Sequence, residues 1–125
     1  MKKKIREQLK ALIGQEVTIY IDRPIGTRHP KYKDIVYPIN YGYIKEIIAA
    51  DNEYQDAYLL GVEEMVEAYT GKVYAIIERE NDNEDKLIIV PKNMEFSIEE
   101  IKEKIDFHKP FLVPRATKSF SKLGI

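Results

Sequence analysis

Five short segments with the pattern of β-strands follow one another along the chain, and they constrain the fold more than any other feature of the sequence. In the first, residues 15–22, the apolar Val17, Ile19 and Ile21 alternate with polar neighbours. A period of two is typical of a strand with one buried face. Turn and loop residues separate it from four further segments that we expect to be extended, at residues 40–49, 56–62, 72–79 and 86–90.

A helix is predicted on each side of this set of strands. Near the N-terminus, apolar residues recur at helical spacing over residues 2–13, at Ile5, Leu9, Leu12 and Ile13. Near the other end, Ser97 and Glu100 have the spacing of a capping box, which predicts a helix over residues 97–106. We therefore expect a mainly β fold: a five-stranded OB-like Greek-key barrel with an N-terminal and a C-terminal helix packed outside it.

Length and composition exclude several classes of protein. The 125 residues are enough for one domain, expected to span residues 1–125, with an irregular tail after Pro110. No apolar run approaches the roughly 20 residues that cross a membrane, and no signal-peptide pattern is seen, so a cytoplasmic location is expected. The chain has no cysteine, which excludes thiolate metal sites, and its net charge of −1 argues against a nucleic-acid-binding protein.

Carboxylates gather in two of the expected turns. Asp51, Glu53 and Asp56 lie within six residues of one another between the second and third strands, and Glu80 and Glu84 lie in the loop before the fifth. Mg²⁺ takes oxygen ligands, usually one or two carboxylates together with water and substrate phosphates. A barrel that brought both loops to the same end would form a metal site, whereas each loop alone is equally compatible with a solvated acidic turn.

A basic loop and a tyrosine-rich segment follow the first strand. A phosphate could be bound by the basic side chains Arg23, Arg28, Lys31 and Lys33, although a solvated loop would have the same composition. His29, in the same loop, is expected to be a surface or turn residue. In the segment 37–43, the Tyr41 hydroxyl can donate a hydrogen bond to a phosphate, and the other tyrosines are expected to pack the barrel. Gly42 would let two backbones approach closely.

Two motifs in this region together resemble a known family. Tyr37-Pro38-Ile39-Asn40-Tyr41-Gly42-Tyr43-Ile44, followed by Asp51-Asn52-Glu53-Tyr54-Gln55-Asp56-Ala57, resembles the soluble inorganic pyrophosphatases, which carry Y-P-x-N-Y-G-[FY]-I and then D-G-D-P-x-D-V at the same separation. Lys86-Leu87-Ile88-Ile89-Val90-Pro91 is similar to the family's K-L-x-x-V-P strand. The resemblance covers roughly residues 15–91, and residues 21–30 look like a short bacterial subgroup of pyrophosphatase-like proteins.

The resemblance implies a barrel of the expected type and hydrolysis of pyrophosphate, a small phosphoanhydride, to two phosphates with Mg²⁺ or Mn²⁺. It implies that Asp51 and Asp56 are metal ligands, with Asp56 bridging two ions. Glu84 and, more loosely, Glu80 stand for two further metal ligands of the family. The resemblance also implies a homo-oligomer.

The same resemblance assigns the catalytic residues. Glu53 stands where the family has an aspartate that helps to deprotonate the attacking water. Tyr41 would hydrogen-bond a phosphate oxygen and Lys86 would neutralise phosphate charge, while Arg28, Lys31 and Lys33 would rebuild the rest of the phosphate site.

The sequence departs from the family pattern at several places, three of which are single-residue replacements. Glu53 is one methylene longer than the family's aspartate, Tyr54 replaces a proline, and Lys33 stands where the family has a glutamate. A second hypothesis is therefore a catalytically weakened barrel that binds a phosphorylated ligand or a protein partner. A third is an oligonucleotide-binding barrel that stacks bases on its tyrosines, which the net charge and the acidic turns disfavour.

Overall fold

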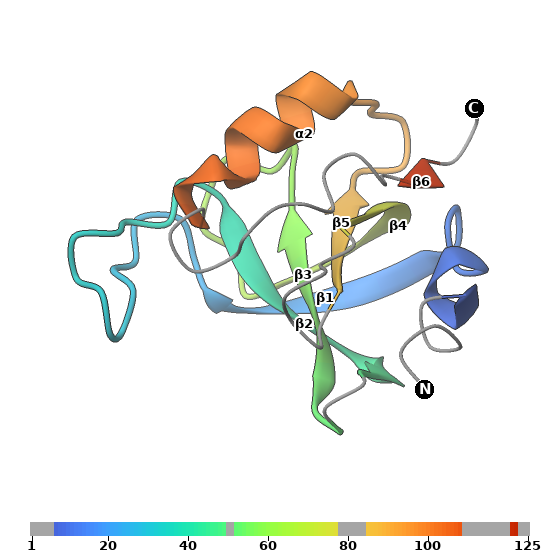
Figure 1. The fold of residues 1–125 in the computed structure, drawn as a ribbon, viewed down its shortest axis with the longest axis horizontal. Helices are drawn as coiled ribbons and strands as arrows, with labels where there is room; N and C mark the ends of the chain where they lie inside the picture. The colour runs from blue at the N-terminus through green and yellow to red at the C-terminus, as the bar shows by residue number, and fades with distance from the viewer. Residues whose placement is uncertain (1–6, 50–51, 78–84, 109–120, 123–125) are drawn as a thin grey trace.

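The computed structural model describes residues 7–49, 52–77, 85–108 and 121–122 of the chain (Figure 1). Residues 7–10 are helical and lead through a turn into the first strand. The named elements of the described residues are β1 (Glu16–Arg23), β2 (Asn40–Ile48), β3 (Tyr54–Leu59), β4 (Ala68–Ile77), β5 (Lys86–Val90), α2 (Ile98–Ile105), the 3-10 helix η1 (Asp106–His108) and β6 (Ser121–Lys122).

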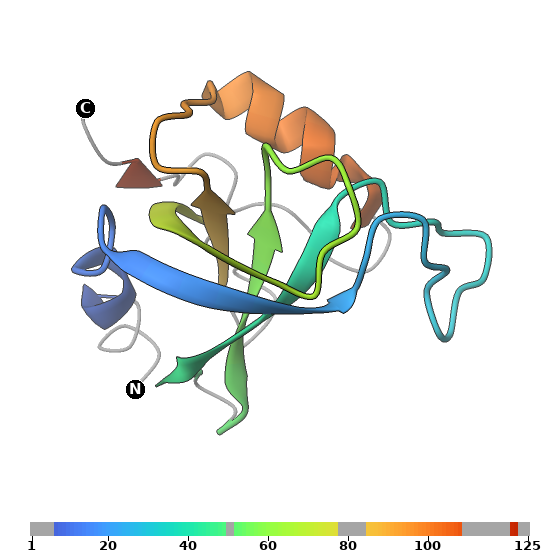
Figure 2. The same cartoon turned by 180° about the vertical axis from the view of Figure 1, so that it is seen from behind.

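The first five strands close into a barrel. The sheet order is β1-β2-β3-β5-β4, and β1 also pairs with β4, which joins the two edges. The pairs are antiparallel except for β3 and β5, which run parallel. Figure 2 shows β1 running across the barrel as its closing strand. The mainly β, OB-like barrel predicted from the sequence is therefore confirmed.

Several parts of the chain differ from the sequence prediction. The third strand was expected at residues 56–62 but spans Tyr54–Leu59, and the described part of the helix expected over residues 2–13 is helical at 7–10 and a turn from 11. β4 begins at Ala68 rather than at Lys72, because its first residues pair with β1 as far as Tyr20, opposite Ala68. The tail was expected to be irregular, yet Ser121 and Lys122 form β6, which pairs with β4 at Ile76 and Ala75. This part of the β4 edge lies beyond the register that β1 occupies, so its backbone groups are open to another strand.

The strands separate two apolar layers. Side chains on one face fill the barrel, and Leu9 from the N-terminal helical segment joins them. They are Leu9, Ile19, Ile44, Ala57, Leu59, Val73, Ile76, Leu87 and Ile89. Alternate residues of the same strands, such as Tyr58 and Ile88, point outward and form a second cluster with Ile101 and Ile105 of α2. Residues 57–59 of β3 and 87–90 of β5 are apolar on both faces because one face lines the barrel and the other packs under a helix.

The helix α2 has the predicted N-terminus. The Glu100 backbone N–H donates to Ser97 Oγ at 3.1 Å, and the Ser97 N–H donates to Glu100 Oε1 at 2.7 Å. Phe96 and Ile101 are both buried in the outer cluster, as the hydrophobic staple requires. None of the described helices has the length and apolar content needed to cross a membrane.

A β-bulge interrupts β1 at its C-terminal end. Ile21 pairs with Gly42 and Arg23 pairs with Tyr41, so Asp22 is an extra residue with no partner position on β2. Up to Ile21 the strand alternates regularly between barrel and surface. The bulge shifts that alternation, and it brings Arg23 opposite Tyr41 on the outer face.

Candidate functional site

Three neighbouring strands bring together Tyr41 from β2, Asp56 from β3 and Lys86 from β5. The Lys86 Nζ donates to Tyr41 Oη at 2.9 Å and to Asp56 Oδ2 at 2.9 Å. The Lys86 side chain is 7% exposed, whereas that of Asp56 is 32% exposed. The cluster therefore holds a nearly buried positive charge beside a carboxylate that still faces water.

Gln55 fixes the segment from which Lys86 projects. It is buried, and its Nε2 donates to the Asp85 carbonyl oxygen at 2.6 Å and to the Asp56 carbonyl oxygen at 2.9 Å. Because these two carbonyls belong to β3 and to the residue before β5, the amide ties the lysine to the aspartate that it contacts.

Arg23 and Tyr37 extend the cluster on the side of β1. Arg23 Nη1 donates to Tyr37 Oη at 2.8 Å, and the guanidinium lies 5.8 Å from the centre of the Tyr37 ring. Burial acts against the Arg23 charge, but the hydrogen bond to Tyr37 and the neighbouring Asp22 leave the Arg23 pKa raised. Tyr37 is fully buried and its ring contacts Tyr41, so this second cation lies next to the Lys86 cluster.

Asp22, the bulged residue, is a second carboxylate near Asp56. Partial burial raises the pKa of Asp22, the Arg23 charge and a backbone hydrogen bond lower it, and the Asp56 charge adds to the net rise. The sequence did not single out Asp22, and it named Arg23 only as one of the basic side chains that could bind a phosphate. Strand alternation assumes one-to-one pairing, so a bulge that redirects side chains leaves no signal in the pattern.

The acidic residues predicted as metal ligands are only partly described. Asp51, Glu80 and Glu84 lie outside the described residues. Glu53 is exposed in the turn before β3, next to Asn52, whose φ is +69°. Within residues 7–49, 52–77, 85–108 and 121–122, no group of three Asp, Glu or His side chains is placed to hold a metal ion.

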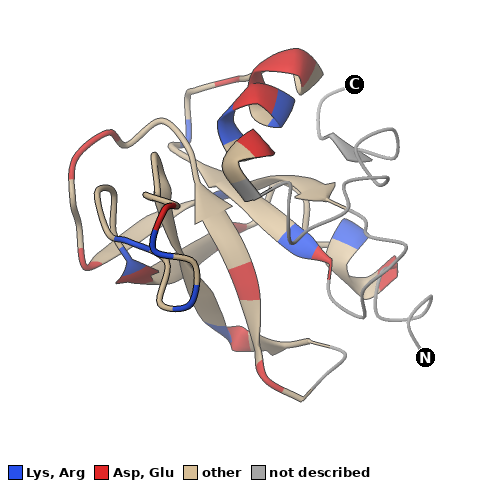
Figure 3. Cartoon of the chain, turned by 60° about the vertical axis from the view of Figure 1, so that its left-hand side comes forward, with Lys and Arg blue, Asp and Glu red and all other residues tan. Residues whose placement is uncertain are grey.

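The predicted phosphate-binding residues Arg28, Lys31 and Lys33 are exposed on the loop between β1 and β2. Figure 1 shows this loop projecting from the barrel, and Figure 3 shows its basic residues in blue. Their described contacts lie within the loop: Arg28 Nη1 donates to the Lys33 carbonyl oxygen at 2.8 Å, and Lys31 Nζ lies 5.3 Å from the centre of the Tyr32 ring. The structure thus brings Arg23, rather than these three residues, to the Lys86 cluster.

His29 organises the same loop. Its Nδ1 accepts hydrogen bonds from the backbone N–H groups of Lys31 and Tyr32, both at 3.1 Å. Burial, and then the charges of Arg23 and Lys31, lower the pKa of His29. A neutral ring is what an accepting Nδ1 requires, so His29 is a turn residue, as expected.

The tyrosines of the 37–43 segment divide between two environments. Tyr37 is buried, as predicted. Tyr43 was also expected to pack the barrel, but it lies half-buried on the outer face, stacked between Tyr20 and Tyr54. Residues 41 and 43 share a face of β2 and Gly42 lies on the opposite face. Tyr43 therefore lies on the outer face, as Tyr41 does.

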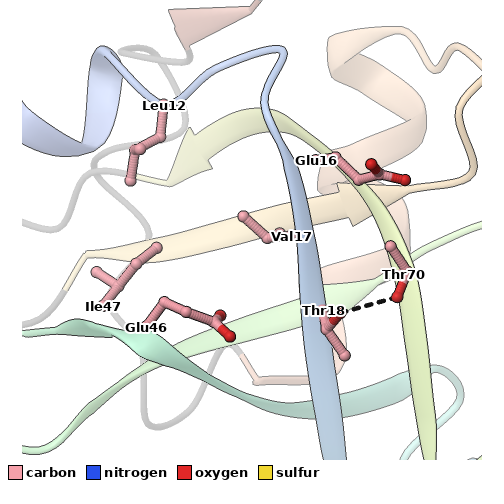
Figure 4. A pocket seen from close by; sticks show the side chains of 7 residues that line it. All are labelled: Leu12, Glu16, Val17, Thr18, Glu46, Ile47 and Thr70. Atoms are coloured by element: carbon pink, nitrogen blue, oxygen red, sulfur yellow. Dashed lines mark hydrogen bonds between the residues drawn. The ribbon is translucent and has the colours of Figure 1, made fainter.

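A hollow of about 490 Å³ lies elsewhere on the barrel (Figure 4). Its described lining combines apolar side chains, two glutamates and a pair of threonines whose hydroxyls are 2.8 Å apart. These residues are Leu12, Glu16, Val17, Thr18, Glu46, Ile47 and Thr70. None belongs to the Lys86 cluster or to the predicted site, so the hollow is separate from the candidate site.

Comparison with known proteins gives a clear result for the fold. No family model and no curated protein sequence matches the chain. Solved structures of inorganic pyrophosphatases do match. That of Ehrlichia chaffeensis is 14% identical, and the match covers 80% of this chain and 83% of that one, with a TM-score of 0.58. That of Thermus thermophilus is 18% identical, with 85% of this chain and 78% of that one covered and a TM-score of 0.58, and that of Neisseria gonorrhoeae is 17% identical, with 77% and 73% covered in the same order and a TM-score of 0.57. The chain therefore has a divergent pyrophosphatase-like fold.

Proposed function

We propose that this protein is a metal-dependent hydrolase of phosphoanhydrides that splits pyrophosphate into two phosphates. The observation that carries the proposal is the Lys86 cluster: a nearly buried ammonium bonded to Tyr41 and to a partly exposed Asp56, on a pyrophosphatase-like barrel. A barrel built only for stability gains little from such an ion pair, because the cost of removing the charges from water offsets their attraction.

The donor set around Asp56 fits a divalent cation. Asp56 Oδ2 contacts Lys86, and Asp22 is near enough for the two carboxylates to repel each other. Paired carboxylate oxygens that face water are the ligands that Mg²⁺ and Mn²⁺ prefer. Asp56 is the proposed principal ligand, with Asp51, Glu80 and Glu84 as the further ligands. A bound ion would polarise the phosphoryl group and lower the pKa of a bound water.

The chain's own residues bind and orient the substrate in this proposal. Lys86 Nζ, held by Tyr41 and Asp56, neutralises charge on a phosphate oxygen, and Tyr41 donates a hydrogen bond to the same group. Glu53 accepts the proton of the attacking water. The water oxygen bonds to one phosphorus as the bridging P–O bond breaks, and the second phosphate leaves with the bridging oxygen. Fixed cations at the developing charge are worth most in a site with little water.

The second candidate is a barrel that binds a phosphorylated ligand without efficient turnover. Glu53 is exposed in its turn, and it is one methylene longer than the family's aspartate. A displacement of about 1 Å at a reacting group can lower the rate on the order of a hundredfold. This candidate keeps the phosphate-binding role of Lys86 and assigns no proton transfer to Glu53.

Phosphate release from pyrophosphate, measured with and without Mg²⁺ or Mn²⁺, tests the proposal. We expect metal-dependent release that falls on the order of a hundredfold in Lys86→Met. Lys72→Met is the matched control, because Lys72 is a half-buried lysine of β4 whose ammonium contacts Tyr74. Absence of release from the wild type with both metals contradicts the hydrolase. Equal release in the two variants contradicts the role assigned to Lys86. Metal-dependent binding of pyrophosphate without release would identify the second candidate.

A further inference from the structure

Three tyrosines from three adjacent strands form a stack on the outer face of the barrel. The ring centres of Tyr20 and Tyr43 are 5.9 Å apart with planes at 27°, and those of Tyr43 and Tyr54 are 5.5 Å apart with planes at 11°. We call Tyr20, Tyr43 and Tyr54 the tyrosine stack. Tyr20 and Tyr43 are direct cross-strand partners of β1 and β2, so the backbone register holds their rings together.

The two ends of the tyrosine stack differ. At the Tyr20 end, the ammonium of Lys45 lies 4.5 Å from the centre of the Tyr20 ring. At the other end, Tyr54 is 47% exposed. Among the described residues, Tyr43 is the group that stacks on Tyr54, and no second ring or cation is stacked there. The stack therefore presents one aromatic face to solvent, and that face belongs to Tyr54.

The exposed end lies next to the Lys86 cluster. Tyr54 and Asp56 are two residues apart on β3, so their side chains share a face at a spacing of about 7 Å. Tyr43 is directly opposite Asp56, and Asp56 is bonded to Lys86. A molecule with a planar group on Tyr54 would extend toward Lys86 over a distance that a sugar can span.

We propose that Tyr54 stacks the base of a nucleotide whose phosphates lie at Lys86, so that the ligands of this site include nucleoside diphosphates. The phosphate end of this inference rests on the proposed function. In the corresponding hydrolysis, water oxygen bonds to the terminal phosphorus and the bridging P–O bond breaks. The bridging oxygen leaves with the nucleoside monophosphate, and one proton passes to solvent. Base stacking on an aromatic side chain strengthens binding by about tenfold to a hundredfold.

Charge favours a mononucleotide over a nucleic-acid strand. A single-strand groove follows a phosphate backbone with basic side chains, but Glu53 and Asp56 flank Tyr54 in the chain, and the charge of Asp22 acts on Asp56. A short polyphosphate with a bound metal ion needs only one positive side chain, which Lys86 supplies. The pyrophosphatase-like motif has a proline where this chain has Tyr54, so the exposed ring belongs to this chain rather than to the motif.

The test is calorimetric titration with adenosine diphosphate and with ribose 5-diphosphate, which lacks the base, at one fixed Mg²⁺ concentration. We expect the wild type to bind adenosine diphosphate about tenfold or more tightly than the base-free ligand. Tyr54→Leu should remove this ratio and leave base-free binding unchanged, whereas Tyr54→Phe should retain it. Tyr69→Leu, which removes a half-buried tyrosine of β4 outside the stack, should also retain it. Thermal melts establish that each variant is folded.

Equal affinities of the wild type for the two ligands would overturn the inference. An equal loss of affinity for adenosine diphosphate and for ribose 5-diphosphate in Tyr54→Leu would also overturn it, because it would indicate a structural role. Tighter binding of a six-nucleotide single strand than of adenosine diphosphate would identify a nucleic-acid surface instead. Failure of the proposed function would be distinguishable from failure of this inference. If phosphate is not released but the preference for adenosine diphosphate is retained, the site binds nucleotides and the hydrolase proposal fails. Release from pyrophosphate without a base preference leaves the hydrolase and removes the stacking site.

Discussion

Lys86 carries its charge almost entirely out of contact with water, and two of its contacts with described residues explain how the fold tolerates it. Asp56 supplies the opposite charge and Tyr41 a hydroxyl oxygen, both at 2.9 Å. The partners are unequal, because the Asp56 side chain is 32% exposed and that of Lys86 only 7%. Asp56 can therefore exchange part of its interaction with Lys86 for an interaction with a second cation, whereas the buried Lys86 side chain keeps its position.

Asp56 should control the response of the protein to divalent metal. If Mg²⁺ or Mn²⁺ binds the folded state, stability should rise by about 2.7 kcal/mol at a hundredfold excess over Kd. Asp56→Asn should abolish most of this gain, since it removes the proposed principal ligand. Asp34→Asn changes an exposed loop aspartate outside the cluster and should keep the gain. Thermal melts with and without metal measure both, and equal metal-induced shifts for Asp56→Asn and wild type would exclude this site.

Asp22 should give the stability a measurable pH dependence. Its folded-state pKa is raised above 3.8, chiefly by burial, so folding favours its protonated form. The resulting destabilisation is absent at low pH and develops as the pH rises through the raised pKa. Asp22→Asn should therefore stabilise the protein at pH 7, by less than about 1 kcal/mol because solvent screens the group, and the difference should shrink toward pH 4. Melting curves of both proteins over this range check it; a less stable variant at pH 7 would contradict the assignment.

Among the elements, those with strong local signals agree with the sequence prediction. Alternation at Val17, Ile19 and Ile21 identifies β1, and the capping box identifies α2, because these patterns depend only on near neighbours. The bulge at Asp22 and the strand β6 depend on register and on an open strand edge, which are properties of the assembled sheet. Elements that rest on long-range pairing are therefore the ones that sequence patterns miss.

The capping box of α2 should make a measurable contribution to stability. Ser97→Ala removes the acceptor for the Glu100 N–H and should lower the free energy of unfolding by about 1 kcal/mol. Lys102→Ala changes an exposed position of the same helix and should stay within about 0.5 kcal/mol of wild type. Urea denaturation of the two variants measures the difference. Indistinguishable midpoints would mean that the cap bonds are replaced by water at no net cost.

At the scale of the whole molecule, the sequence predicted the fold better than it predicted the site. The motifs that resemble pyrophosphatases lie on β2, β3 and β5, so the barrel that places these strands side by side also brings Tyr41, Asp56 and Lys86 together. The basic residues of the 24–39 loop are different, because their positions depend on loop contacts such as those of His29. Composition indicates that such a loop is basic but not where its side chains lie.

Assembly is a second property of the whole molecule, and we propose that the protein forms a homo-oligomer, as its resemblance to the pyrophosphatases implies. Exposed apolar side chains are available for such an interface, among them Met65 at 66% exposure. Sedimentation velocity at micromolar concentration should detect species heavier than the 14.6 kDa chain. A single species of that mass would refute the proposal.

The backbones of β1 and β2 approach each other very closely at Gly42. A Cβ at this position would lie 1.8 Å from the Tyr20 carbonyl oxygen, which is backbone and cannot move independently of β1. Gly42→Ala should therefore force β1 away from β2, and because β1 also pairs with β4, both sides of the closure are strained. We expect a loss of at least about 3 kcal/mol of unfolding free energy.

Gly26→Ala is the matched control for Gly42→Ala. Apart from its two chain neighbours, no atom of the described residues lies within 4 Å of its Cβ position, and its φ of +90° is what opposes the change. Such a positive φ in a residue other than glycine carries a penalty of about 1–3 kcal/mol, and Gly26→Ala should remain near the lower end because its loop is exposed and can relax. Urea unfolding of the two variants, read by circular dichroism, separates crowding from backbone strain. A Gly42→Ala variant no less stable than Gly26→Ala would show that β1 and β2 can move apart at Gly42 without opening the barrel.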